Sequence, residues 1–256
     1  MAIEWGWVAL GLAAFFAGFI DAVAGGGGLI QVPALFTGLP SETPGRIFGT
    51  NKLASIVGTA NATWRYARRI DLPWAVAFPT AGAAFVFSFG GAAVVDWMPK
   101  DLVRPIVLVL LIAVIAHTLL RPDFGKFAGQ EPDPQALWIR GLLFGAVMGF
   151  YDGFFGPGTG SFLIFGFVRF FGMDFLRASG TAKVVNLATN AAALSYFVPT
   201  GNVIWLVGGL MAVANMVGAQ LGARAALRHG SGFVRWMFVA VAGVLAIKFA
   251  YDTFAA

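Results

Sequence analysis

Two lysines in apolar surroundings, each with a matching aspartate, are the residues of this chain best suited to bind an ion. Lys52 ends the sequence GTNK, and Lys183 ends the sequence GTAK in the second half of the chain. The distance along the sequence from Lys52 to Lys183, which we call the repeat offset, also separates Asp21 from Asp152. Charged side chains are costly inside a membrane and usually mark ion or substrate pathways there. We therefore expect these four residues to form a functional site.

Glycine-rich stretches follow both aspartates and are expected to interrupt the helices that carry them. Residues 25–28 are four consecutive glycines, and residues 156–160 are Gly-Pro-Gly-Thr-Gly. Glycine is unfavourable inside a helix and easily adopts positive φ, so we predict a break at each stretch with a new helix after it. Backbone N–H groups at a helix start favour an anion. The expected ligand is a small anion.

We expect both breaks, both lysines and nearby hydrogen-bonding groups to hold this anion. The candidate binding residues are Gly25, Gly26, Gly27, Gly28, Thr50, Asn51, Lys52, Gly156, Gly158, Thr159, Gly160, Thr181, Lys183 and Asn186. Two structural alternatives stay open: the glycines only allow close helix packing, and the lysines extend to the membrane interface. Asp21 and Asp152 are candidates for coupling, as proton acceptors or Na⁺ ligands, or they only neutralise a lysine.

The composition indicates an integral membrane protein made of helices. Hydrophobic residues make up 59% of the chain and charged residues 11%, against about a quarter charged in soluble domains. The absence of cysteine excludes thiol relays and thiolate metal sites, and with two histidines we expect no metal and no cofactor. The net charge of +5 is explained by cytoplasmic loops rather than by nucleic acid. The expected surroundings are a lipid bilayer.

These elements must position the charged residues within two similar halves. We predict apolar helices at 5–24, 29–39, 47–64, 72–95 and 102–120, the second too short to span a membrane. The expected domains are a first transmembrane repeat at 1–120, a cytoplasmic linker at 121–136 and a second repeat at 137–256. Each repeat should hold one broken or re-entrant helix pair and three spanning helices.

The repeat offset recurs along both halves, while their basic loops differ. Trp74 matches Trp205, and Arg104 matches Arg235. The loop with Arg65, Arg68 and Arg69 has no basic counterpart near residues 197–200. Because loops rich in Lys and Arg stay in the cytoplasm, we expect the two repeats to be inverted, with both termini outside. The fold class expected is an all-α membrane bundle of two inverted repeats.

The motifs resemble those of a known family. Residues 21–27 and 152–158 both have the pattern Asp-x-x-x-Gly-x-Gly, and GTNKL and GTAK follow them. In these features the chain is similar to the TauE/SafE family, also called toluene sulfonate uptake permeases. The resemblance implies uptake or export of sulfite, sulfoacetate or other organosulfonates across the bacterial inner membrane. Asn51 against Ala182, and Gly26 against Pro157, depart from symmetry, so the two half-sites should contribute unequally.

The sequence thus predicts a secondary transporter that moves a small sulfonate or sulfite by alternating access, with proton coupling. One alternative is a passive anion channel of the same architecture. Another is a membrane protein that assists assembly of a partner complex without transport. An enzyme is not expected, because we find no nucleophile with a base, no metal ligands and no phosphate-binding loop. The oligomeric state leaves no trace in the sequence.

Overall fold

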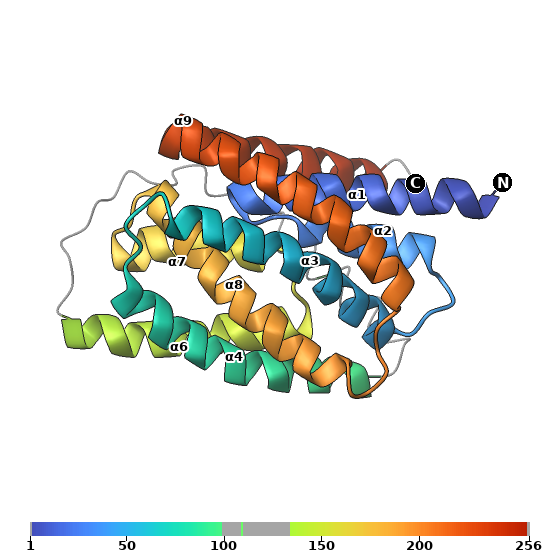
Figure 1. The fold of residues 1–256 in the computed structure, drawn as a ribbon, viewed down its shortest axis with the longest axis horizontal. Coiled ribbons are helices and arrows are strands. Elements are labelled where there is room, and N and C mark those ends of the chain that lie inside the picture. Colours follow the sequence, from blue (N-terminus) through green and yellow to red (C-terminus); the bar gives the residue numbers. More distant parts are fainter. Residues whose placement is uncertain (1, 99–108, 110–133, 255–256) are drawn as a thin grey trace.

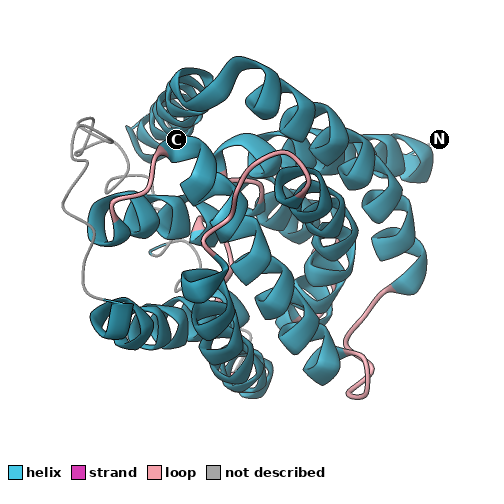
Figure 2. Cartoon of the chain, turned by 60° about the vertical axis from the view of Figure 1, so that its left-hand side comes forward, coloured by secondary structure: helices cyan, strands magenta, loops and turns pink. Residues whose placement is uncertain are grey.

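In the described part of the chain, helix is the only regular secondary structure, as the sequence predicts. The computed structural model describes residues 2–98, 109 and 134–254. The helices are α1 (Ala2–Ala24), α2 (Gly28–Gly38), α3 (Pro44–Ala67), α4 (Trp74–Trp97), α6 (Pro134–Phe154), α7 (Thr159–Phe171), α8 (Phe175–Phe197) and α9 (Trp205–Phe254) (Figures 1 and 2). The predicted helix at 102–120 lies outside the described residues, apart from residue 109. Helix α6 begins at Pro134, so the end of the expected linker, residues 134–136, is helical.

Among the described residues, three stretches are long and apolar enough to cross a membrane, by length and composition. They are Gly6–Ala24, Trp74–Trp97 and Trp205–Gly230. Helices α2 and α7 are apolar but shorter. Helix α9 contains a non-helical residue, Gly230, with φ 72° and ψ −167°, so it consists of two helices joined at a kink.

Capping residues fix where the two lysine-bearing helices begin. Thr43 accepts a hydrogen bond from the backbone N–H of Arg46, and Pro44 follows it as the first residue of α3. Asp174 caps α8 through the N–H groups of Leu176 and Arg177. Helix α3 therefore begins one turn before the predicted start at residue 47. Both lysines lie about two turns inside their helices.

Both predicted helix breaks are present, and they touch each other. Gly25 has φ +79° between α1 and α2, and Gly156 has φ +89° between α6 and α7. A Cβ atom on Gly25 would collide with the backbone of Gly160, and one on Gly160 with that of Gly25. Ser161 stabilises the contact through two hydrogen bonds. Its backbone N–H donates to the carbonyl oxygen of Gly25 at 3.1 Å, and its hydroxyl group donates to the carbonyl oxygen of Ala24 at 3.0 Å. The glycines thus provide both the positive φ and the close packing.

Helices from the first half of the chain pack along helices from the second half. Helix α1 packs along α9, and α4 packs along α6, while α3 and α8 lie between these two pairs (Figure 1). Glycines allow the close approach at equivalent places: Gly18 lies against the backbone of Asn215, and Gly149 lies against that of Ala84. Each break is therefore enclosed by helices from both halves.

Candidate functional site

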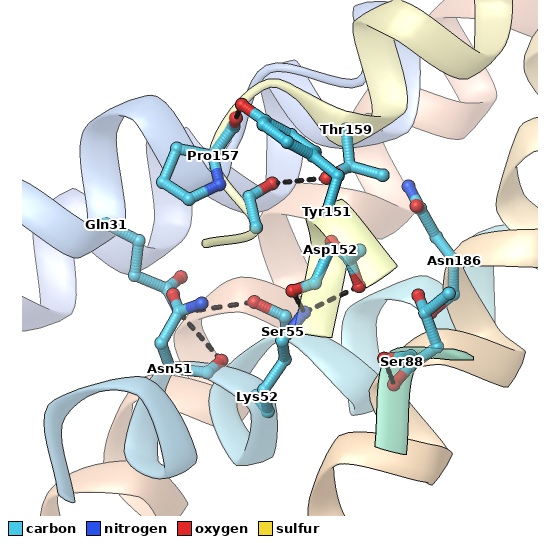
Figure 3. A network of polar contacts seen from close by, with 12 residues as sticks. Gln31, Asn51, Lys52, Ser55, Ser88, Tyr151, Asp152, Pro157, Thr159 and Asn186 are labelled. Carbon is cyan, nitrogen blue, oxygen red and sulfur yellow. Dashed lines mark hydrogen bonds and ion pairs between the residues drawn. The ribbon is translucent and has the colours of Figure 1, made fainter. Parts of the chain in front are cut away.

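Each lysine forms an ion pair with the aspartate of the other half. The Nζ atom of Lys52 lies 2.6 Å from Asp152 Oδ2 and also donates to the Asp152 carbonyl oxygen at 2.8 Å (Figure 3). Lys183 Nζ lies 2.9 Å from Asp21 Oδ2. The side chains of Lys52 and Lys183 are only 3% and 0% exposed. The alternative that the lysines extend to the membrane interface is therefore wrong.

Burial makes the separation of these pairs expensive. Two charges taken out of water are stable only as long as each keeps its partner and its hydrogen bonds. Removing one partner of a buried pair typically costs about 3–5 kcal/mol, because the remaining charge is left without compensation. An anion bound at Lys52 would therefore keep the lysine paired if Asp152 moved away.

A cavity lies between the two breaks, with the Lys52–Asp152 pair in its wall. Its lining consists of Asp21, Gly25, Gly27, Gly28, Asn51, Lys52, Ser55, Thr59, Asp152, Gly156, Thr159, Gly160, Asn186, Asn190 and Asn215. Its volume of about 40 Å³ holds a few water molecules but is too small for an organosulfonate. An organosulfonate would therefore need the helices around the cavity to move apart before it could bind.

One wall of the cavity is a closed hydrogen-bond network. The amide group of Gln31 donates to Asn51 Oδ1 at 2.9 Å and more weakly to Ser55 Oγ at 3.3 Å (Figure 3). Asn215 Nδ2 in turn donates to Gln31 Oε1 at 3.0 Å. Gln31, Asn51 and Asn215 are all buried. These satisfied amides hold α2, α3 and α9 together beside Lys52.

The other wall carries an amide oxygen without a partner. Asn186 is 7% exposed, and its Oδ1 atom accepts no hydrogen bond from any described residue. A buried polar atom left unpaired typically costs about 1–3 kcal/mol. Such atoms are rare in folded proteins and call for a ligand, water or ion as the missing partner. Asn186 Oδ1 is therefore an open acceptor in the cavity wall, which a water molecule or another hydrogen-bond donor can fill.

The structure gathers most of the predicted site but places some residues elsewhere. Gly26, Thr50, Gly158, Thr181 and Lys183 do not line the cavity. The hydroxyl of Thr50 donates to the carbonyl oxygen of Arg46 and accepts from the N–H of Ile204, so it joins helices. The hydroxyl of Thr181 donates within its own helix. The hydroxyl groups of Thr50 and Thr181 are therefore used in hydrogen bonds within the protein and are not free to bind a ligand.

Several residues at the cavity were not among the predicted ligands, and part of their signal was present in the sequence. Ser55 and Thr59 are related to Asn186 and Asn190 by the repeat offset, so the repeat pairs polar positions on α3 and α8. Together with Asn51, Ser55 and Thr59 also recur at every fourth position, which places them on one helix face. Neither Gln31 nor Asn215 has a polar residue at the position related to it by the repeat offset, and neither belongs to a periodic row of polar residues on its helix. Only the fold brings these two side chains to the site.

Comparisons with known proteins agree along almost the whole chain. Residues 10–249 match the family model described as "Sulfite exporter TauE/SafE". The chain is 38% identical over 242 residues to "Probable membrane transporter protein ORF9" of Sinorhizobium sp, covering 94% of this chain and 91% of that protein. It is 36% identical over 243 residues to "Probable membrane transporter protein YfcA" of Escherichia coli strain K12, covering 94% and 88%. No solved structure matches.

Proposed function

The chain belongs to the TauE/SafE family of membrane transporters, and on this premise we propose that it is a secondary transporter of a small sulfur-containing anion, an organosulfonate or sulfite. As a member of a transporter family it is not an enzyme. The main support for an anionic substrate is the buried Lys52–Asp152 pair in the wall of the central cavity, and the choice of a sulfur-containing anion rests on the description of the family. The lysine supplies a positive charge in the cavity wall, where its side chain is only 3% exposed.

The two helix starts suit an oxyanion such as a sulfonate. The backbone N–H groups of Gly28 and Gly160, in the first turns of α2 and α7, donate no hydrogen bond to any described residue. Free amides and the positive end of a helix dipole favour negative charge. A sulfonate group has three oxygens, so it can accept from both helix starts and from Lys52 at once.

Counterion exchange at Lys52 gives a mechanism for proton coupling. The arriving anion takes the place of the Asp152 carboxylate beside Lys52. An unpaired carboxylate is costly to bury, so Asp152 takes up one proton as it leaves the lysine. The buried charge is then unchanged when one monovalent anion and one proton bind together. Transport of such an anion should therefore be electroneutral, with a stoichiometry of one proton per anion.

The contacts between the halves support alternating access by two inverted repeats. The pairs Lys52–Asp152 and Lys183–Asp21 are related by the repeat offset, and so are the helix contacts α4 with α6 and α1 with α9. Equivalent contacts of this kind allow one half to rock against the other around a shared site. In this arrangement both termini face outside and the linker faces the cytoplasm.

Uptake into proteoliposomes tests this function. Vesicles with the wild type should accumulate labelled methanesulfonate, a monovalent sulfonate, when the proton concentration outside is raised, and unlabelled sulfite should compete. Lys52→Gln should lower the initial rate by at least about tenfold, because the anion loses its charged partner. Asp152→Asn should leave downhill exchange of methanesulfonate measurable but remove its dependence on the proton gradient. Arg140→Gln, an exposed guanidinium on α6, serves as the matched control and should behave like the wild type.

Different failures have different meanings. Saturable uptake by the wild type that ignores proton and sodium gradients would contradict the coupling and favour a passive facilitator. A folded wild type that moves neither sulfite nor any of several sulfonates would contradict the substrate class. Equal rates for Lys52→Gln and Arg140→Gln would show that the anion does not bind at Lys52.

A further inference from the structure

A second cavity lies at the end of α3, apart from the central one. Five arginines line it: Arg65, Arg68, Arg69, Arg224 and Arg228. They come from the last turn of α3, the loop after it and the first part of α9. No residue of this arginine cavity lines the central cavity. It is therefore a separate site with a strongly positive wall.

The positive charges of this cavity have no anionic partner in the described part of the chain. None of the five guanidinium groups lies within ion-pair distance of a described carboxylate. The nearby Arg177 does pair with Asp71, at 3.5 Å, but neither of these residues lines the cavity. Like charges held close together repel, so an anion in the cavity would be stabilised by several guanidinium groups at once.

Neutral side chains hold two of the five arginines, Arg65 and Arg224, without neutralising them. With its amide oxygen turned toward them, Gln220 accepts from Arg65 at 2.9 Å and from Arg224 at 3.0 Å. Asn61 Oδ1 accepts from Arg65 Nε at 3.0 Å. Amide acceptors fix the direction of both guanidinium groups and leave their charge available. This is the arrangement expected of a preformed anion site.

The remaining lining places the arginine cavity at the membrane interface. The guanidinium carbon of Arg68 lies 4.6 Å from the ring centroid of Trp64, and the indole is 53% exposed. Tryptophan is enriched at the level of lipid headgroups. Arg224 and Arg228 lie in the last two turns of the candidate span that ends at Gly230. Ile70, Leu176 and Leu227 add an aliphatic surface beside the charges.

The fold itself does not require these arginines, as the other half of the chain demonstrates. The positions related to the five arginines by the repeat offset hold Ala93, Trp97, Tyr196, Pro199 and Thr200, none of which is basic. There the polar contacts are neutral or acidic: Asp96 accepts from Tyr196 at 3.1 Å and from Asn202 at 2.8 Å. The arginines at this end of the repeat unit are thus present in the first of the two equivalent places and absent from the second.

We propose that the arginine cavity binds the phosphate group of an anionic phospholipid. Guanidinium groups pair with phosphate through two parallel hydrogen bonds, and basic pockets between membrane helices bind lipid headgroups in this way. The exposed indole and the aliphatic lining favour a lipid over a free anion, because they offer contacts to the glycerol and the first acyl carbons. Since basic residues stay in the cytoplasm, the lipid comes from the inner leaflet.

Native mass spectrometry of the detergent-purified protein tests this site. Titration with dioleoylphosphatidylglycerol should give a Kd at least about tenfold lower than titration with dioleoylphosphatidylcholine. Arg68→Gln and Arg224→Gln should each weaken phosphatidylglycerol binding by about fivefold, as expected for one arginine near a lipid phosphate. Arg140→Gln removes a guanidinium group outside the cavity and should leave the Kd unchanged.

Circular dichroism and gel filtration establish that each variant is folded before its binding is compared. Equal affinity for the two lipids, or equal losses in Arg140→Gln and Arg68→Gln, would overturn the proposal. Displacement of phosphatidylglycerol by an equal concentration of inorganic phosphate would also overturn it, because the cavity would then hold a free anion. None of these results depends on which anion the central cavity transports.

Discussion

The two ion pairs use the same residue types but have different surroundings. Lys52 lines the central cavity and binds both the carboxylate and the backbone carbonyl of Asp152. Lys183 is completely enclosed and does not reach the cavity, although its partner Asp21 does. Asp21 is also the more exposed of the two carboxylates, at 23% against 7%. We therefore expect the anion to bind at Lys52, while Lys183 holds Asp21 at the opposite side of the cavity.

Two buried asparagines at the cavity should respond in opposite ways to the same substitution. Asn186→Ala removes an acceptor that has no partner among the described residues, so the melting temperature should stay equal or rise; anion uptake should fall because the sulfonate loses the Nδ2 donor of this amide. Asn215→Ala leaves Gln31 Oε1 without its donor, so it should lower the free energy of unfolding by about 1–3 kcal/mol. Thermal unfolding in detergent and uptake by proteoliposomes measure the two effects. A large loss of stability in Asn186→Ala would contradict a ligand role for this amide.

The helix breaks could be predicted from the sequence because single residues decide them, and the positive φ of Gly25 and Gly156 suits glycine. The start of α3 was predicted one turn too late, although Thr43 with Pro44 forms a standard helix start. The tertiary pairing could not be predicted in the same way. The repeat offset is equally consistent with Lys52 beside Asp21 or beside Asp152, and only the packing of the halves decides between them.

Polar residues of the site were harder to predict where no periodicity marks them. Asn215 lies in an apolar span, and its partner Gln31 lies on the short helix α2, far away in the sequence. Nothing in either local sequence indicates that these amides meet. The burial of the lysines also stayed open in the sequence, since a cation near a helix start is equally compatible with the interface. The opposing carboxylates are what make their burial stable.

At the scale of the elements, contact between the two breaks should be sensitive to a single methyl group. Gly25→Ala would bring a Cβ atom against the backbone of Gly160 and would also force a side chain into positive φ. Gly160→Ala meets the backbone of Gly25 without the φ penalty. Both should lower the melting temperature and abolish uptake, because the breaks would separate and the cavity would lose its shape.

A matched substitution separates this contact from a general effect of alanine. Gly82 lies in α4, and a methyl group added there would meet no neighbouring heavy atom within 4 Å, so Gly82→Ala should be neutral or slightly stabilising. Comparable losses in Gly82→Ala and Gly160→Ala would contradict the specific role of the contact between the breaks.

At the scale of the whole molecule, the proposed inverted repeats predict a particular topology in the membrane. Inverted repeats place equivalent loops on opposite sides. The natural chain has no cysteine, so single cysteines can be introduced without a background. Asp71→Cys lies in the loop after α3, and Pro199→Cys lies in the equivalent loop after α8; both positions are exposed.

A maleimide that does not cross membranes should label these two cysteines from opposite sides in oriented vesicles. Asp71→Cys should react from the cytoplasmic side, next to the basic loop, and Pro199→Cys from the outside. Permeabilised vesicles serve as the control, because both positions should then react fully. Labelling of both from the same side would contradict the inverted arrangement. The two Lys–Asp pairs would then not be related by an inverted repeat. Alternating access around the central cavity would lose its structural basis.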